Sequence, residues 1–114
     1  MSKKPSRLDL LRDTAPKLVE LTEKIAYDDV WEREELSKRD RSLITVAGLV
    51  AMNRERQLPG HLDRALDNGV TREELIEAIT HMAFYSGWPT ALTAAAIAKD
   101  VFAKRDEAED QDND

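Results

Sequence analysis

Apolar residues recur every three or four positions along most of this chain, which is the spacing of amphipathic helices. Over the first part of the chain they fall at Leu8, Leu11, Ala15, Leu18, Leu21 and Ile25. Pro16 fits a first helical turn and not a helix interior. The pattern therefore predicts a short lead-in followed by a helix that begins near Ala15, with a connection over residues 28–31.

A second helix is predicted from Ser37 onward. Ser37 and Asp40 have the spacing of a capping box, in which the first side chain caps the helix and an acid stands three residues later. The residues that follow are apolar on nearly all sides, which is typical of a buried helix. We expect this helix to be the central one and to fray over residues 53–56.

The second half of the chain predicts three further helices. One covers residues 58–68, with Pro59 near its start and Asn68-Gly69 as its stop. The next opens at a stronger capping box, Thr71 to Glu74, and ends at Gly87. The last covers residues 89–105 and is rich in alanine. The fold class is therefore all-α, with five to six helices and short loops.

The charge of the chain is concentrated at its end. The net charge is −6, and residues 106–114 hold acids and no bases; without them 17 acidic residues face 17 basic ones. The sequence predicts a flexible start over 1–7, one helical domain over 8–105 and a disordered acidic tail over 106–114. A body that is close to neutral predicts no nucleic-acid partner.

Cysteine is absent, which excludes disulfides, thiolate metal sites and cysteine nucleophiles. No apolar run approaches the roughly 20 residues that cross a membrane, and the N-terminus has no apolar leader. We expect a cytoplasmic protein with no membrane partner. The two histidines lie twenty apart with no recognisable ligand spacing, so no metal site is predicted.

The segment from Glu77 to Pro89 concentrates the polar aromatic chemistry of the chain. Glu77, His81 and Tyr85 repeat every four residues and share one helix face, and Trp88 extends that row to the Gly87 break. A carboxylate, an imidazole, a phenol and an indole at a helix end predict a small-molecule site. Core packing is the competing interpretation for Tyr85 and Trp88.

Several motifs in one order resemble the carboxymuconolactone decarboxylase family, whose members are related to the alkylhydroperoxidase D fold. The resemblance covers residues 31–102 and is carried by 36–43 (LSKRDRSL), Leu58 with His61-Leu62, 65–71 (ALDNGVT) with Glu74, and 85–89 (YSGWP) with Ala91. It implies an all-helical subunit that assembles as a homo-oligomer, a trimer or hexamer, with sites near subunit interfaces.

The family includes two activities. One is the decarboxylation of γ-carboxymuconolactone in aromatic compound catabolism, a lyase reaction. The other is peroxide reduction through a Cys-x-x-Cys pair followed by a histidine. His61 matches that histidine, but the two cysteine positions fall on Arg54 and Gln57, and the family's proton-relay glutamate falls on Ser42. The resemblance therefore implies a cysteine-free, decarboxylase-like member and disfavours peroxidase activity.

Decarboxylation of such a lactone needs no metal and no organic cofactor. The protein must hold carboxylates, stabilise an enolate oxygen and supply a proton. Arg39 and Arg41, in the first turn of the central helix, are candidates for binding a substrate carboxylate; the alternative is a salt bridge to a nearby acid.

His61 and His81 are the candidate proton-transfer residues, because an imidazole titrates near neutrality. Glu77, one turn before His81, would orient that ring. Tyr85 would donate to the enolate oxygen and Trp88 would form a wall of the pocket. A structural role for either histidine is the competing interpretation.

Two function classes follow. One is a decarboxylase-like enzyme that acts on a small carboxylated lactone-like molecule. The other is a non-enzymatic binding or assembly module that kept the fold. The enzyme requires Arg39, His61, His81 and Tyr85 to converge on one cavity, whereas scatter into separate salt bridges favours the module.

Overall fold

A computed structural model describes residues 7–112 of the chain, and every regular element in that range is a helix. Six α-helices are present there and no strand, so the predicted all-α class is confirmed. The chain divides into two compact units, Met1–Ser37 and Lys38–Asp114. The predicted flexible start, residues 1–7, lies outside the described range except for Arg7, which begins the first helix.

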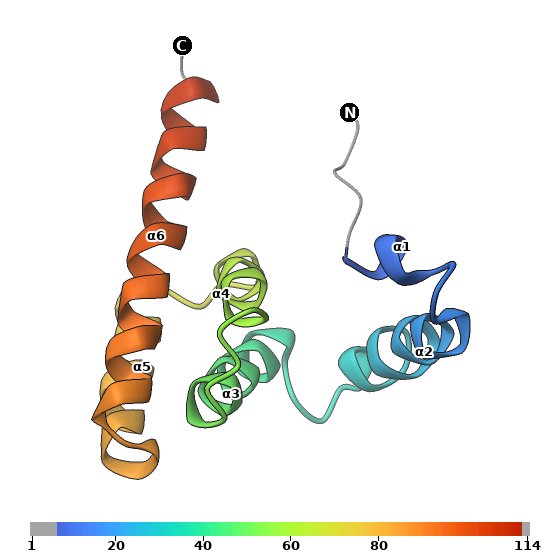
Figure 1. The fold of residues 1–114 in the computed structure, drawn as a ribbon, viewed down its shortest axis with the longest axis horizontal. Coiled ribbons are helices and arrows are strands. Elements are labelled where there is room, and N and C mark those ends of the chain that lie inside the picture. The colour runs from blue at the N-terminus through green and yellow to red at the C-terminus, as the bar shows by residue number, and fades with distance from the viewer. Residues whose placement is uncertain (1–6, 113–114) are drawn as a thin grey trace. The chain divides into compact units, whose positions relative to one another are not determined.

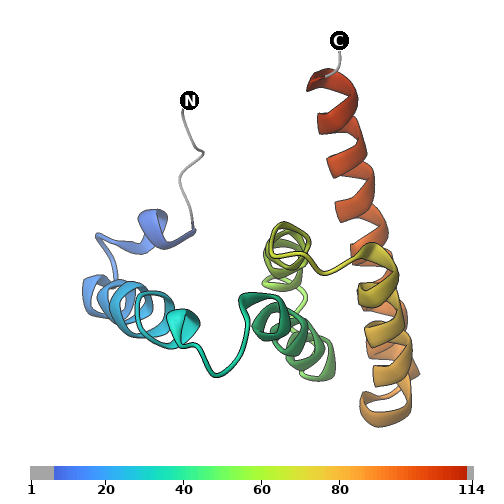
Figure 2. The same ribbon diagram turned by 180° about the vertical axis from the view of Figure 1, so that it is seen from behind.

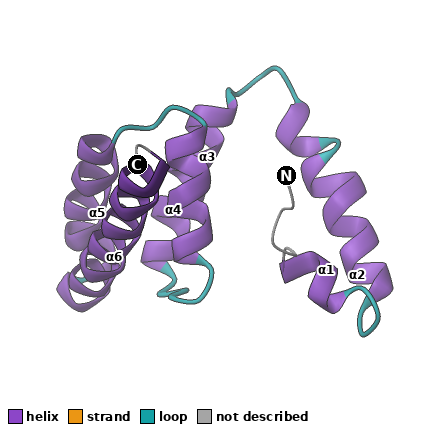
Figure 3. Cartoon of the chain, turned by 90° about the horizontal axis from the view of Figure 1, so that it is seen from above, coloured by secondary structure: helices purple, strands orange, loops and turns teal. Residues whose placement is uncertain are grey.

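The first unit contains α1 (Arg7–Leu11) and α2 (Pro16–Leu21). Pro16 occupies the first turn of α2, as predicted. The helix continues as a π-helical segment, η1 (Thr22–Tyr27), and a 3-10 turn, η2 (Val30–Glu32), lies in the predicted connection. Figure 3 shows a loop that turns the chain between α1 and α2, so that α1 lies beside the start of α2.

This first unit builds almost no core of its own. Val19 is the one buried side chain among residues 7–37. Leu10, Leu18 and Ile25 are 69%, 60% and 52% exposed. An open apolar hollow is lined by Leu21, Thr22, Ile25, Ala26, Val30 and Trp31. The unit is held instead by surface contacts, chiefly two hydrogen bonds of 2.8 Å from Arg12 to the Glu23 carboxylate.

The second unit is built from two helical hairpins. The first hairpin is α3 (Lys38–Ala51) with α4 (Leu58–Asp67), and the second is α5 (Arg72–Ser86) with α6 (Trp88–Asp112). In Figures 1 and 2, α5 and α6 lie side by side and the α3–α4 pair lies next to them. The hairpins pack through α3 against α5 and α4 against α6.

One hydrophobic core joins the four helices of the second unit. Its buried side chains are aliphatic and mostly small, in keeping with the alanine content: Val46, Val50, Leu58, Leu62, Ala65, Val70, Leu75, Ile79, Ala83, Ala91, Ala94, Ala98 and Val101. Alanines on α6 allow it to approach its neighbours closely, since they carry no side chain beyond Cβ.

The central helix α3 is buried on one side only, which corrects the prediction of burial on nearly all sides. Ser42, Val46 and Val50 are buried, but Ile44 is 59% exposed. Its neighbours α4, α5 and α6 belong to the same four-helix unit and cover one side of it. The number of apolar side chains on a helix does not reveal how many neighbouring helices are available to cover that helix.

The predicted stop of α4 and both predicted ends of α5 are confirmed. The Thr71 side chain accepts from the Glu74 backbone N–H at 3.0 Å, and the Glu74 carboxylate accepts from the Thr71 N–H at 2.9 Å. Gly69 and Gly87 stop α4 and α5 with φ of 99° and 104°, where a side chain would be strained.

The acidic end is helical as far as Asp112, where the sequence predicts disorder from residue 106. Arg72 donates to the Asp106 carboxylate at 2.8 Å, and Arg105 donates to Asp63 and Asp67 at 3.1 Å each. These ion pairs attach α6 to α5 and α4, so the helix is already formed when it enters the acidic run. Residues 113–114 lie outside the described range. No helix among residues 7–112 has the length and apolar character needed to cross a membrane.

Candidate functional site

A buried polar contact joins the two helices of the α3–α4 hairpin. Asn68, the residue that caps the C-terminus of α4, donates from Nδ2 to the Ser42 Oγ at 2.9 Å. Ser42 is only 1% exposed and is the one buried polar residue of the described core. The hydrogen bond shows which face of α4 is turned toward α3.

His61 lies on that same face of α4. It precedes Asn68 by seven residues, which is two helical turns, or roughly 10 Å along the helix axis. The imidazole is half-buried. Its Nδ1 atom is shielded from solvent and has no hydrogen-bond partner within the part of the chain that the structure describes. A shielded polar atom without a partner costs free energy, so it is unusual and points to a ligand or a function.

The surroundings of His61 disfavour its charged form. Burial is the larger cause and the positive charge of Arg64 the second, and together they lower the pKa of His61 below its usual value near 6.5. The ring is therefore neutral at pH 7 in the free protein. Arg64, one turn beyond His61 on α4, was not among the residues predicted from the sequence. The signal for it was present, because residues three apart on a helix are neighbours.

Of the two predicted carboxylate-binding arginines, Arg39 is engaged in ion pairs. It donates to the Asp40 carboxylate at 2.9 Å and to the Glu74 carboxylate. These bonds, that to Glu74 foremost, raise the pKa of Arg39. The salt-bridge interpretation therefore describes Arg39, which ties the N-terminus of α3 to that of α5. Arg41 is partly buried and directly precedes Ser42, near the end of the hairpin that Asn68 closes.

His81 and Tyr85 lie on the exposed side of α5. Tyr85 is 75% exposed, and its ring stacks on His81 with centroids 5.0 Å apart, so the predicted shared face is present. Trp88 is 55% exposed and meets Phe84 edge to face with centroids 5.1 Å apart. Glu77 is also exposed and makes no hydrogen bond with His81 within the described residues.

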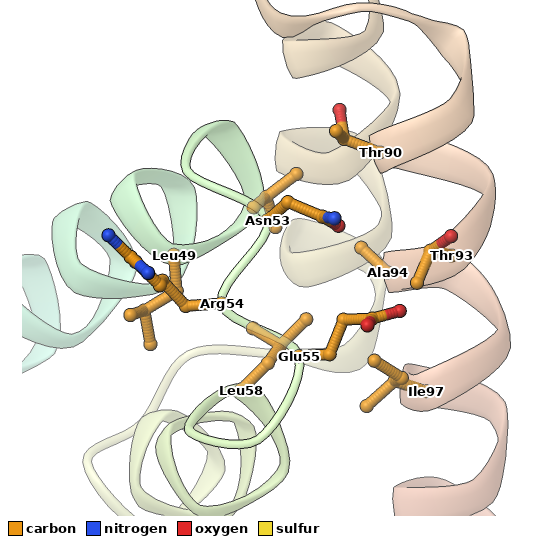
Figure 4. Close-up of a pocket in the computed structure, with 10 residues that line it drawn as sticks. Leu49, Asn53, Arg54, Glu55, Leu58, Thr90, Thr93, Ala94 and Ile97 are labelled. Atoms are coloured by element: carbon orange, nitrogen blue, oxygen red, sulfur yellow. The ribbon is translucent and has the colours of Figure 1, made fainter.

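Neither of the two hollows described within residues 7–112 is lined by the predicted site residues. A narrow crevice in the second unit is lined instead by the end of α3, the turn to α4 and one side of α6: Leu49, Val50, Asn53, Arg54, Glu55, Leu58, Thr90, Thr93, Ala94 and Ile97. Asn53 and Glu55 reach toward α6, whereas Arg54 points away from it (Figure 4). Convergence of the predicted side chains on one cavity was the feature expected of an enzyme. Their separation therefore favours the non-enzymatic assembly module. Sequence spacing placed Glu77, His81 and Tyr85 on one face correctly but could not tell that this face is exposed.

Arg54 and Gln57, which the resemblance places at the family's cysteine positions, lie seven and four residues before His61. Backbone hydrogen bonds from Leu58 to Arg54 and from His61 to Gln57 join the turn before α4 to its first residues. Within residues 7–112 no group of three or more His, Asp or Glu side chains is placed to hold a metal ion.

The α3–α4 hairpin thus carries a neutral imidazole with the Arg64 guanidinium one turn further along α4, and a partly buried Arg41 on α3. Guanidinium groups bind carboxylates, and an imidazole exchanges protons near neutral pH. The arrangement suits a small anionic molecule whose reaction requires a proton.

Comparison with known proteins adds independent information. Residues 16–100 match the carboxymuconolactone decarboxylase family. A 4-carboxymuconolactone decarboxylase of Acinetobacter baylyi is 38% identical over 95 residues, which cover 83% of this chain and 71% of that protein. A nitrosuccinic acid decarboxylase, npaB, of Metarhizium robertsii is 34% identical over 80 residues, which cover 70% of this chain and 56% of that protein.

A third relative, an uncharacterised 15.0 kDa protein of Paracoccus denitrificans, is 31% identical over 83 residues, 71% of this chain and 62% of that protein. This chain therefore spans less than two-thirds of the Metarhizium and Paracoccus proteins.

Proposed function

This chain belongs to the carboxymuconolactone decarboxylase family as a cysteine-free member, and we propose that it is a decarboxylase of a small carboxylated molecule. The substrate class that we favour is a lactone with a carboxylate whose loss leaves a stabilised carbanion. Two relatives with different named substrates are both decarboxylases, which supports the reaction type more strongly than any one substrate.

The two named compounds share a chemical feature. In each, the carboxylate that leaves stands on a carbon from which electrons can pass to an oxygen, that of a conjugated lactone carbonyl or of a nitro group. The carbon–carbon bond breaks, CO₂ departs, and the electron pair is held as a dienolate or a nitronate. A proton then adds to carbon. The protein must stabilise one oxyanion and supply one proton.

The hairpin residues fit these requirements. We assign the carboxylate or the developing oxyanion to Arg64 and Arg41, because guanidinium groups form strong charge-assisted hydrogen bonds with such oxygens. We assign the proton to His61. A bound anion offsets the charge of Arg64 and favours the protonated imidazole, so binding of substrate itself recruits the proton that the product requires.

One observation carries this assignment. The Nδ1 atom of His61 is shielded from solvent and has no partner among the described residues, on a helix face that also carries Asn68 and is turned toward α3. A purely structural histidine would normally have both ring nitrogens hydrogen-bonded or exposed. His81, which is exposed on α5, lacks this feature.

The non-enzymatic module remains the second candidate, and the state of Arg39 favours it. Its guanidinium is already paired with Asp40 and Glu74, so it is not available for a substrate without breaking those pairs. In this alternative the helical fold serves assembly alone.

The test is the release of CO₂ by the purified protein from γ-carboxymuconolactone and, separately, from nitrosuccinate. We expect saturable turnover of at least one of the two. Correctly folded protein that releases no CO₂ above the uncatalysed rate from either compound would contradict the enzyme and leave the assembly module.

A further inference from the structure

The dipeptide Asn68-Gly69 directly follows α4, at the start of the connection to α5 (Figure 2). Asparagine before glycine is the pair that loses its side-chain amide most readily, because a following residue without Cβ lets its backbone nitrogen approach the asparagine side chain. The two other asparagines of the chain, Asn53 and Asn113, precede an arginine and an aspartate. Asn68 is therefore the one asparagine whose sequence context favours this chemistry.

The reaction has two steps and consumes only water. The backbone nitrogen of Gly69 loses its proton and attacks the side-chain carbonyl carbon of Asn68. A carbon–nitrogen bond forms, and the side-chain amide leaves as ammonia. Water then opens the resulting succinimide ring at either of its two carbonyls, which gives aspartate or β-linked isoaspartate. No group is oxidised or reduced, and both products carry a carboxylate where an amide stood.

In the folded protein both reacting groups are held by hydrogen bonds. The attacking nitrogen, that of Gly69, donates to the Leu66 carbonyl at 3.1 Å. The departing nitrogen, Nδ2 of Asn68, donates to the buried Ser42 hydroxyl at 2.9 Å. Ring closure requires both bonds to break, so the closed α3–α4 hairpin opposes the reaction.

The turn itself is anchored in the core. The Val70 backbone nitrogen donates to the Ala65 carbonyl at 2.9 Å, and both of these residues are buried. Together with the bond from Gly69 to Leu66, this contact forms a Schellman motif, which ends α4 in one fixed conformation. The peptide unit between Asn68 and Gly69 cannot rotate toward ring closure unless this part of the hairpin opens.

We propose that Asn68 is a site of spontaneous deamidation, which the closed α3–α4 hairpin suppresses and which reacts when the bond to Ser42 breaks. Local openings of this kind are transient in native proteins, and a reaction that requires them follows the population of the open state. Because deamidation is irreversible, it converts a transient opening of the hairpin into a permanent change of the chain.

The modified chain should have a weaker hairpin. An aspartate at position 68 has no amide to donate to Ser42, and it places a negative charge at the carbonyl end of α4, where the helix dipole disfavours it. Isoaspartate also lengthens the backbone by one atom and displaces the turn. The new carboxylate stands one helical turn after Arg64, so under the proposed function it would compete with a substrate anion for that guanidinium.

The test incubates the intact protein at mildly alkaline pH and follows Asn68 by peptide mass. Trypsin cleaves after Arg64 and Arg72 and releases residues 65–72, in which Asn68 is the only amide side chain. We expect a product in which a hydroxyl has replaced the amide, resolved by chromatography into aspartate and isoaspartate forms. The peptide 42–54 carries the exposed Asn53, which is the internal control and should react more slowly.

Two variants test the protection by the hairpin. Ser42→Ala removes the acceptor and should raise the rate at Asn68 about 5–30-fold, because loss of a buried hydrogen bond increases the population of the open hairpin. Thr80→Ala removes a hydroxyl that bonds only within the exposed face of α5, and it should leave the rate unchanged. Circular dichroism checks that each variant is folded before incubation.

Wild-type protein unfolded in guanidinium chloride gives the unprotected rate and requires no variant. We expect Asn68 to react faster there than in the folded protein. An Asn68 peptide that stays unmodified even in the unfolded protein would overturn the site. Equal rates at Asn68 in folded and unfolded wild type, or in folded wild type and folded Ser42→Ala, would overturn its suppression by the hairpin.

Discussion

Asn68 donates a hydrogen bond of 2.9 Å to Ser42, and this contact closes the α3–α4 hairpin at the end opposite its turn. The Ser42 hydroxyl is almost fully buried, so the bond is shielded from competition by water. It also fixes the side of α4 from which His61 projects. The stability of the hairpin and the geometry of the proposed site therefore depend on the same pair of residues.

Ser42→Ala should lower the free energy of unfolding by about 1–3 kcal/mol, because it leaves the Asn68 amide without its buried acceptor. Urea denaturation measures the change. Thr80→Ala is the matched control, since the Thr80 hydroxyl bonds only to the Ile76 carbonyl on an exposed helix face. Equal stabilities for the Ser42 variant and the wild type would show that the hydrogen bond contributes nothing net.

The pKa of His61 should lie below 6.5 in the folded protein. Proton NMR of the ring protons measures it directly, and the urea-unfolded protein supplies the reference near 6.5. Arg64→Gln should raise the pKa of His61 only part of the way to that reference, because burial is the larger cause and remains. A folded-state value at or above 6.5 would contradict the environment described for this ring.

The same shift predicts how stability depends on pH. Because its pKa is lower in the folded protein, His61 binds a proton more readily in the unfolded state. The unfolded state is therefore stabilised relative to the folded state as pH falls. This contribution is absent above about pH 6.5 and grows as pH decreases toward the folded pKa. Between these limits, the wild type should lose more stability on acidification than His61→Gln. If the stability of the two proteins fell in parallel as pH decreases, the pKa of His61 would not be lowered by folding.

Gly87→Ala should destabilise the fold by about 1–3 kcal/mol, since a side chain at its φ of 104° is strained. Gly60 offers a matched control within α4, with an ordinary helical conformation and no atom within 4 Å of an added Cβ. Gly60→Ala should be neutral or stabilise by about 0.5–1 kcal/mol, because alanine favours helix. Thermal unfolding compares the two, and a Gly87→Ala protein as stable as Gly60→Ala would be inconsistent with the strained turn.

Thr71→Ala should cost about 1 kcal/mol by removing the side-chain cap of α5. Glu74→Gln tests the other half of the box through pH. Hydrogen bonds from the Thr71 backbone and from Arg39 lower the pKa of Glu74, so its stabilising contribution is present above its unfolded pKa near 4.5 and is lost as pH falls through the lower folded value. The wild type should therefore lose stability over that acid range more steeply than Glu74→Gln. Identical acid profiles in chemical denaturation would contradict the role of the carboxylate.

Features set by neighbouring residues were predictable from the sequence. The Thr71–Glu74 capping box and the stop at Gly69 each depend on a few adjacent positions, and both are present as predicted. The helical end of the chain was not predictable in this way. It depends on ion pairs between Arg72 and Asp106 and between Arg105 and Asp63, which are 34 and 42 residues apart.

The candidate site shows the same division. Helical spacing placed His81 and Tyr85 on one face, and their rings do stack. Whether that face meets the core or the solvent depends on how α5 packs against α3 and α6, which local spacing does not encode. For His61, helical spacing marks Arg64 as a neighbour three residues on, but the shielding of Nδ1 depends on the folded packing around the ring, which local spacing does not encode.

The proposed decarboxylation depends most directly on His61, and the decisive measurement compares kcat for CO₂ release by wild type, His61→Gln and His81→Gln on whichever compound the protein decarboxylates. Loss of a proton-transfer residue should lower kcat by about 10²–10⁴-fold. We expect a loss of that order in His61→Gln and near wild-type turnover per chain in His81→Gln. A folded His61→Gln protein with wild-type turnover would contradict the assignment of the proton to His61.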